Sequence, residues 1–260
     1  MKKASDNLRD FYELEYQRGN RGDPITPIPK TDDFMYAQVL RQLAPHLKPG
    51  IEVLDIGCNN GNLSLFMATE GCNVLGIDIA RNAIDLALNS ANYYNIHNVK
   101  FKSIDFLREW NKAQSFDFVL CSHILEHIPN DAAFLKHIQQ SLKPKGVLLL
   151  LTPTKYSSFY IVNKSIKGYV QFDKEVGHLR RYTKREISTL IANAGFKINK
   201  VVFLDGILRD WFILCKRLRW LNMVWGQPVV RDIFNRVDEQ SAKLLFPGSI
   251  CVHAQKECEN

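Results

Sequence analysis

The stretch Val53-Leu54-Asp55-Ile56-Gly57-Cys58-Asn59-Asn60-Gly61-Asn62 decides the fold of this chain. An apolar run carries an acid, a glycine-rich turn follows it, and a helical pattern begins directly afterwards. This order is typical of the first strand, loop and helix of an open α/β sheet. Ligands of that architecture bind at the carboxyl ends of the strands. Glycines in the turn let the backbone approach a ligand that a Cβ atom would block.

The rest of the chain alternates strand and helix patterns with short turns between them. We expect further strands at 73–78, 99–104, 116–121, 147–151, 196–203 and 247–256. We expect helices at 80–93, 130–142, 183–194 and 206–225, one that begins at Thr31 or Asp32, and a short one within 4–20. For the helix at 183–194, Thr183 is the expected N-cap and Glu186 occupies the capping-box position. The alternation predicts an α/β fold with a mostly parallel sheet covered on both faces.

The predicted organisation is one core with additions. Residues 47–205 form the α/β core, with an insertion at 154–181 over the active-site end of the sheet, and 247–260 contribute its closing strand. Residues 1–46 are expected to form an N-terminal helical cap, and 206–246 a helical cap insertion. The expected helix at 206–225 has tryptophans at helical spacing and basic residues on another side. It therefore suits a membrane surface, a cover over the acceptor pocket, a dimer face or ordinary cap packing.

The composition limits the classes of protein to which this chain can belong. The chain has 260 residues, 46% hydrophobic and 23% charged, which is ordinary for a globular protein with a full core. No apolar run reaches the roughly 20 residues of a membrane span, and no apolar segment follows the first lysines as a secretory signal would require. The six cysteines are scattered without a C-x-x-C pair, which favours reduced thiols in a cytoplasmic protein. The net charge is +7, and many of the excess basic residues lie at 180–185 and 216–219. Such residues either bind an anionic partner or form a solvated surface.

The spacing of glycines in the first loop distinguishes between two classes of cofactor. A dinucleotide loop needs G-x-G-x-x-G, but Asn59 and Asn62 stand where its second and third glycines belong. The alternative frame is Asp55-x-Gly57-x-Asn59-x-Gly61. A carboxylate at the strand end suits a cationic ligand and repels a pyrophosphate.

This frame resembles motif I of the class I S-adenosylmethionine-dependent methyltransferases, and the resemblance covers roughly residues 36–200. It implies a doubly wound, seven-stranded Rossmann-like fold, S-adenosylmethionine as cofactor and S-adenosylhomocysteine as product. In the family the loop glycines lie alongside the methionine part of the cofactor, and the first acid lies near its ammonium group. The acids after strands 2 and 3 bind the ribose and the adenine amino group. The residues that match these positions or flank them are Asp55, Gly57, Cys58, Asn59, Gly61, Asp78, Ile79, Asp105, Phe106 and Cys121. Asn59 departs from the usual glycine, although asparagine tolerates left-handed backbone.

The segment after the fourth strand, Cys121-Ser122-His123-Ile124-Leu125-Glu126-His127-Ile128-Pro129, resembles that of the ubiquinone/menaquinone-type small-molecule methyltransferases. It faces the methyl group in this fold. We expect His127, His123 or His178 to act as the general base, since imidazole titrates near neutral pH. Some relatives hold a divalent metal with Glu-x-x-Glu-His; the corresponding set here is His123, Glu126 and His127. Many others keep Leu-Glu-His without a metal, and we favour a site without one.

The function that the resemblance implies is methyl transfer to an oxygen, rather than a nitrogen or carbon, of a small-molecule or lipid/quinone-like acceptor. His178 and Arg181 would border the acceptor pocket. The alternatives are transfer to a glycan, a lipid-linked sugar or RNA, and a binding module without turnover. Nucleic acid is disfavoured, since the chain has no platform of interleaved aromatic and basic residues and lacks the family's base-methylation signature. Peripheral membrane contact through 206–225 remains an expectation.

Overall fold

The computed structural model describes residues 13, 25–111, 113–157, 173–209, 228–245 and 247–257. The strands in these ranges form a seven-stranded sheet of order β3-β2-β1-β4-β5-β7-β6. Their bounds are β1 Glu52–Ile56, β2 Asn73–Asp78, β3 Val99–Ser103, β4 Phe116–Ser122, β5 Leu142–Pro153, β6 Phe196–Leu204 and β7 Ser249–Lys256. The first five strands are parallel, and β7 lies antiparallel between β5 and β6. The predicted fold class is confirmed.

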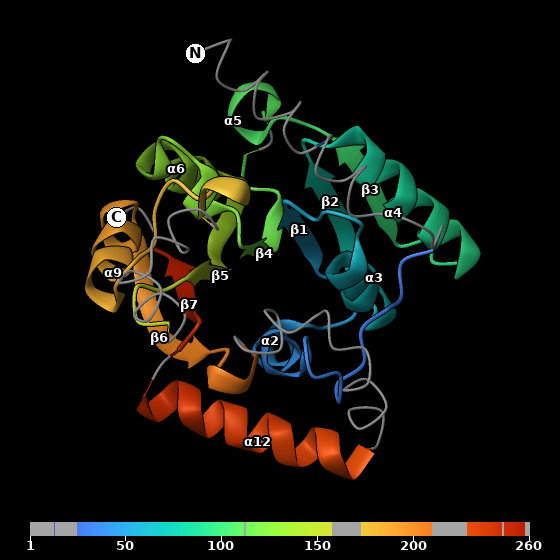
Figure 1. Ribbon diagram of the computed structural model, residues 1–260. Helices are drawn as coiled ribbons and strands as arrows, with labels where there is room; N and C mark the ends of the chain where they lie inside the picture. Colours follow the sequence, from blue (N-terminus) through green and yellow to red (C-terminus); the bar gives the residue numbers. More distant parts are fainter. Residues whose placement is uncertain are drawn as a thin grey trace.

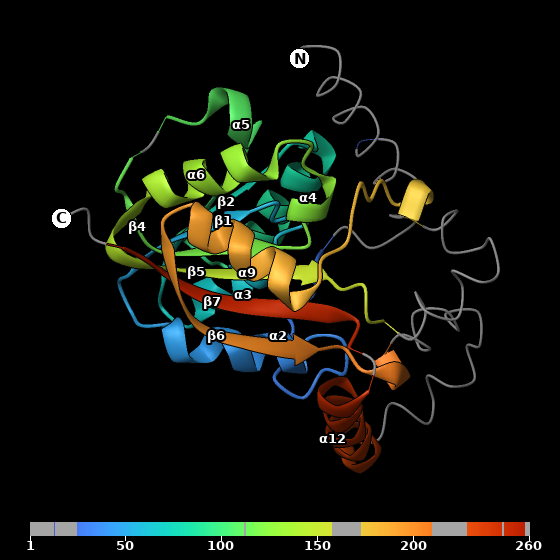
Figure 2. The ribbon, with the colours of Figure 1, turned by 90° about the vertical axis from the view of Figure 1, so that its left-hand side faces the viewer.

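Helices cover both faces of this sheet (Figure 1). The α-helices are α2 Ala37–Leu43, α3 Asn62–Thr69, α4 Arg81–Tyr93, α5 Phe106–Glu109, α6 Asp131–Ser141, α9 Lys184–Asn193 and α12 Pro228–Leu244, and the 3-10 helices are η1 Ala44–His46 and η2 Leu125–His127. Figure 2 shows α6 and α9 above the strands and α2 below them, with α12 crossing beneath the end of β6. None of the helices in the described ranges combines the length and apolar character needed to cross a membrane.

Alternation along the strands divides the core into two layers. In β1, Leu54 and Ile56 join the cluster under α6 and α9, whereas Val53 joins the cluster under α2, α3 and α4. Successive strand residues point to opposite faces, and both faces here are buried. This is why the strands appear in the sequence as continuous apolar runs rather than as alternating patterns.

Several boundaries differ from the sequence-based expectation. Helix α2 begins at Ala37 rather than at Thr31 or Asp32, because residues 31–36 form turns that tuck Phe34 into the interior. Strand β5 begins at Leu142 and includes Lys143-Pro144-Lys145-Gly146, which the sequence marks as a turn. Helix α12 is an additional helix within the expected 206–246 cap. The expected short helix within 4–20 and most of the expected helix at 206–225 lie outside the described residues.

Candidate active site

The loop between β1 and α3 has left-handed backbone at three positions. The φ angles of Gly57, Asn59 and Gly61 are 72°, 50° and 81°. A Cβ atom at Gly57 would lie 2.1 Å from Cδ1 of Ile124, in the segment that follows β4. Glycine is required there by both its backbone and its neighbour. The glycine-rich loop therefore lies directly against the segment that carries His123, Glu126 and His127.

Asp78, the last residue of β2, is tied to this loop. Its Oδ2 accepts the backbone N–H of Asn59 at 2.8 Å, and its Oδ1 accepts that of Ala80 at 2.9 Å. Burial raises the pKa of Asp78, and the backbone donors partly oppose that rise. The side chain thus presents a carboxylate at the carboxyl edge of the sheet, beside the turn that contains Asn59.

Asp55 lies deeper, inside β1. The residue is 2% exposed, and its Oδ2 accepts a hydrogen bond from the Ser64 hydroxyl of α3 at 2.5 Å. Burial raises the pKa of Asp55 to about 7, and the negative charge of Asp78 adds to the rise while Ser64 opposes it. The neighbouring Cys58 thiol is buried, and its pKa is raised well above its ordinary value for the same reason. The two acids therefore share a desolvated region under the loop.

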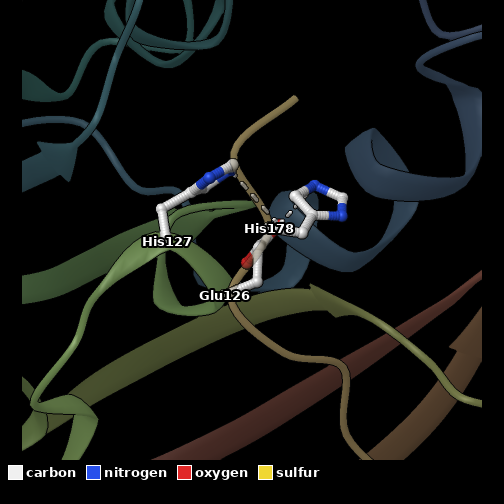
Figure 3. A group of neighbouring side chains, drawn as sticks. All are labelled: Glu126, His127 and His178. Atoms are coloured by element: carbon white, nitrogen blue, oxygen red, sulfur yellow. Dashed lines mark ion pairs between the residues drawn. The ribbon is translucent and has the colours of Figure 1, made fainter. Parts of the chain in front are cut away.

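Glu126 is the centre of a cluster of imidazoles after β4. Its side chain is fully buried, and Oε2 accepts the Thr152 hydroxyl at 3.2 Å. Oε1 has no hydrogen-bond partner among the described residues. It lies 3.5 Å from Nδ1 of His123, 4.0 Å from Nε2 of His127 and 4.0 Å from Nε2 of His178. Figure 3 shows His127 and His178 on two sides of the Glu126 carboxylate.

The pKa values of the ionisable side chains in this cluster shift in different directions. Burial alone would raise the pKa of Glu126, but His123 and then His127 bring it below its ordinary value. Burial lowers the pKa of His127. Desolvation opposes the protonation of His123, yet the Glu126 carboxylate raises its pKa above the usual value. At neutral pH the cluster thus combines an ionised carboxylate with a neutral His127.

The two imidazoles of Figure 3 have oxygen partners on their other ring nitrogens. Nδ1 of His127 lies 3.0 Å from the carbonyl oxygen of Gly177, and Nδ1 of His178 lies 2.8 Å from Oδ1 of Asp173. Their rings meet edge to face with centroids 4.9 Å apart. Residues 173–178 therefore complete the cluster from a segment far from β4 in the sequence.

Comparison with known proteins decides the family. Residues 32–201 match the family described as a methyltransferase domain, which is more than half of the chain. The chain belongs to this methyltransferase family. The predicted membership of the class I S-adenosylmethionine-dependent methyltransferases, with that cofactor, is thereby confirmed.

Curated relatives of this methyltransferase include proteins named ubiquinone biosynthesis O-methyltransferase. The relative from Coxiella burnetii (strain RSA 493 / Nine Mile phase I) is 32% identical over 165 residues, which are 64% of this chain and 65% of that protein. The relative from Rickettsia bellii (strain OSU 85-389) is 23% identical over 201 residues, 75% of this chain and 82% of that protein. The chain thus spans slightly less than two thirds of the length of its Coxiella relative.

Solved structures share the fold of this methyltransferase. Phosphoethanolamine N-methyltransferase 2 of Haemonchus contortus, in complex with S-adenosyl-L-methionine, has a TM-score of 0.63 at 19% identity and covers 86% of this chain and 53% of its own. The [4+2]-cyclase SpnF has a TM-score of 0.62 at 18% identity and covers 85% of this chain and 82% of its own. Since one neighbour is named a cyclase, the fold alone does not define the reaction.

Some of the site residues expected from the sequence lie at the carboxyl edge of the sheet, and others lie in the interior. Asp105 caps α5, where its Oδ1 accepts the Leu107 N–H at 3.1 Å. Phe106 is buried and meets Phe134 edge to face, and Cys121 is buried within β4. The side chains of Phe106 and Cys121 thus belong to the core beneath the expected cofactor position, while Asp78 and the loop lie at the edge.

Sequence reasoning missed three partners of the site: Ser64, Thr152 and Asp173. Ser64 and Thr152 are ordinary hydroxyl residues whose contacts arise only from strand and helix packing. Asp173 stands five positions before His178 in a stretch without a clear period, so no local pattern signals their contact. The guanidinium of Arg181, a residue expected to border the acceptor pocket, contacts Asp173 at 3.0 Å, and Arg180 contacts Asp131 at 2.6 Å.

Proposed function

We propose that this protein transfers the methyl group of S-adenosylmethionine to a hydroxyl oxygen of a small quinone-like acceptor. The observation that carries this proposal is the contact between Gly57 and Ile124. It places the glycine-rich loop directly against the segment with the carboxylate and imidazoles. Relatives named ubiquinone biosynthesis O-methyltransferase support oxygen as the methylated atom and a quinone-like molecule as the acceptor.

Three acids are proposed to bind the cofactor, together with the loop residues Gly57 to Gly61. Asp78 is assigned to the two ribose hydroxyls. A carboxylate has about four acceptor positions, and the backbone N–H groups of Asn59 and Ala80 donate to the Asp78 carboxylate. Asp55 is assigned to the electrostatic attraction of the ammonium and Asp105 to the adenine amino group, and Ile79 follows Asp78 directly in the sequence. Cys58, Phe106 and Cys121 support this surface from below.

The cofactor supplies an activated methyl group on a sulfonium, which is a good leaving group. The protein must align the acceptor oxygen with that methyl and accept its proton. The C–S bond breaks as the O–C bond forms, and the hydroxyl proton passes to a ring nitrogen. His127 suits this role because its lowered pKa keeps it neutral at pH 7. His123 and His178 lie around the same carboxylate and can accept or relay the proton.

One observation favours a metal-assisted variant of this reaction. Oε1 of Glu126, which has no hydrogen-bond partner in the part of the chain that the structure describes, forms a group with one ring nitrogen each of His127 and His178. These atoms lie within 4.8 Å of one another. A carboxylate with two imidazoles suits a transition metal, so these residues fit such an ion, with His178 where the sequence-based set had His123. A bound ion would act as a Lewis acid and make the acceptor hydroxyl easier to deprotonate.

Two measurements test the proposal. Isothermal titration with S-adenosylhomocysteine should show binding, and its absence at high micromolar ligand would reject the cofactor site. Turnover of S-adenosylmethionine is then measured with a panel of hydroxylated aromatic and quinol acceptors and with matched amines. Methylation confined to the amines would reject the O-methyltransferase assignment. Dialysis against a chelator decides the metal variant: unchanged turnover excludes it, whereas loss restored by Mn²⁺ or Zn²⁺ supports it.

A further inference from the structure

Asp173 connects the imidazole cluster to a buried arginine. Its Oδ1 lies 2.8 Å from Nδ1 of His178, and its backbone carbonyl accepts the His178 N–H at 2.7 Å. The Arg181 guanidinium donates to both oxygens of the same carboxylate, at 3.0 to 3.3 Å. The side chain of Arg181 is 8% exposed and also donates to the carbonyl of Thr154, the residue directly after β5. The Asp173 side chain is therefore fixed from two directions.

This contact determines which nitrogen of His178 carries a proton. An ionised carboxylate can only accept hydrogen bonds, so Nδ1 of His178 must be the donor. In a neutral imidazole the other nitrogen, Nε2, then has the lone pair. Nε2 is the atom that faces Oε1 of Glu126 at 4.0 Å. The carbonyl of Gly177 imposes the same tautomer on His127, whose Nε2 also faces Oε1.

We propose that Asp173 is a positioning residue for methyl transfer. It holds His178 in the tautomer that directs the Nε2 lone pair toward the centre of the cluster, and Arg181 keeps the carboxylate in place for this task. The inference rests on the proposed function. It applies whether Nε2 accepts the proton of the acceptor hydroxyl or binds an ion, since both roles need a lone pair on that atom. A partner on the outer nitrogen is also the usual way to orient a metal-binding histidine.

The substitution Asp173→Asn tests this role with little change in size. The asparagine amide can donate a hydrogen bond to Nδ1, which moves the imidazole proton to Nε2. Long-range ¹H–¹⁵N NMR spectra at pH 8 should show His178 protonated at Nδ1 in the wild type and at Nε2 in the variant. Turnover with the best acceptor of the panel should fall about 100-fold or more, the usual contribution of general acid–base catalysis. The affinity for S-adenosylhomocysteine should stay within about threefold of the wild type, since Asp173 lies outside the proposed cofactor site.

Asp131→Asn is the matched control. Asp131 is a second carboxylate bonded to this segment, through Arg180 at 2.6 Å and the Tyr182 hydroxyl at 2.9 Å, and neither of these partners is a histidine. The control should lower stability without changing the His178 tautomer or turnover. Wild-type His178 protonated at Nε2, or unchanged turnover in Asp173→Asn, would overturn the proposal. The wild-type spectrum decides the tautomer even if the variant does not fold, and failure of the wild type to bind S-adenosylhomocysteine would instead reject the proposed function.

Discussion

The backbone N–H of Asn59 donates to Oδ2 of Asp78 at 2.8 Å. This bond joins the one unusual residue of the glycine-rich loop to the acid proposed to bind the ribose. Asn59 has a φ of 50°, which is the left-handed conformation that glycine usually supplies. The asparagine thus gives the loop the required backbone, and its N–H orients Asp78.

Asp78→Ala should weaken the binding of S-adenosylhomocysteine about 10- to 100-fold, because hydrogen bonds to a charged group contribute roughly 1.5–3 kcal/mol. Isothermal titration measures the change. Asp117→Ala is the control, since this carboxylate bonds Lys143 at 2.8 Å and the Glu52 N–H at 2.9 Å, near the start of β1 and away from the loop. Equal affinities of Asp78→Ala and the wild type would remove Asp78 from the cofactor site.

Asn59→Val should cost about 1–2 kcal/mol of stability, because a β-branched residue resists left-handed backbone. It should also weaken S-adenosylhomocysteine binding, since the Asn59 N–H would no longer be aimed at Asp78. Asn95→Val is the matched control: Asn95 has a φ of 54° after α4, so it should lose similar stability and keep its affinity. Asn59→Gly should bind as the wild type does. Unfolding in urea and titration calorimetry give the two quantities, and loss of affinity in both valine variants would contradict the local role of Asn59.

Asp55→Asn should remove a pH dependence of stability. The pKa of Asp55 is about 7 in the folded protein and 3.8 for the ordinary group, so the folded state retains a proton that the unfolded state has lost between these values. The contribution of Asp55 to the free energy of unfolding therefore decreases as pH rises from about 4 to 7, by an amount on the order of 4 kcal/mol. The apo variant should be more stable than the wild type at pH 8 and similar to it at pH 4, while it binds S-adenosylhomocysteine more weakly. Urea unfolding at both pH values checks this, and a stability difference independent of pH would be evidence against it.

The strand ends were predictable from sequence because burial on both faces makes each strand an apolar run. Asp78 ends β2 and Asp105 follows β3, so parallel topology brings them to one edge without further information. The capping box of Thr183 and Glu186 was also confirmed, since it depends only on residues three apart. In each of these cases the local sequence pattern is enough to place the residue.

The imidazole cluster was predictable only in part. His123, Glu126 and His127 are neighbours in sequence, so one loop brings them together. The position of His178 beside Glu126 depends on how residues 173–181 cross the end of β5, and Asp173 has no periodic pattern to mark it. Helix α12 was anticipated only as part of the helical cap expected at 206–246, without bounds of its own.

The substitution His253→Gln should make the free energy of unfolding less dependent on pH in the acid range. His253 is in β7, where its Nδ1 lies 2.8 Å from Nε2 of His46. Burial, followed by the nearby His46 and Lys200, lowers the pKa of His253 from 6.5 to about 4. In the unfolded chain His253 therefore binds a proton below pH 6.5, whereas in the folded protein it binds one only below about pH 4. The free energy of unfolding consequently decreases as pH falls from 6.5 to 4.

We expect this decrease to be on the order of 2 kcal/mol in the wild type, and smaller by most of that amount in His253→Gln. Glutamine can still hydrogen-bond to His46 and Gln42, which limits the structural damage. Thermal or urea unfolding from pH 7 to pH 4 measures the slope. His97→Gln removes an exposed imidazole and should follow the wild-type curve. If the free energy of unfolding of His253→Gln decreased with falling pH as steeply as that of the wild type, another group would have to cause the decrease. His46 would be the next residue to substitute, because burial lowers its pKa as well.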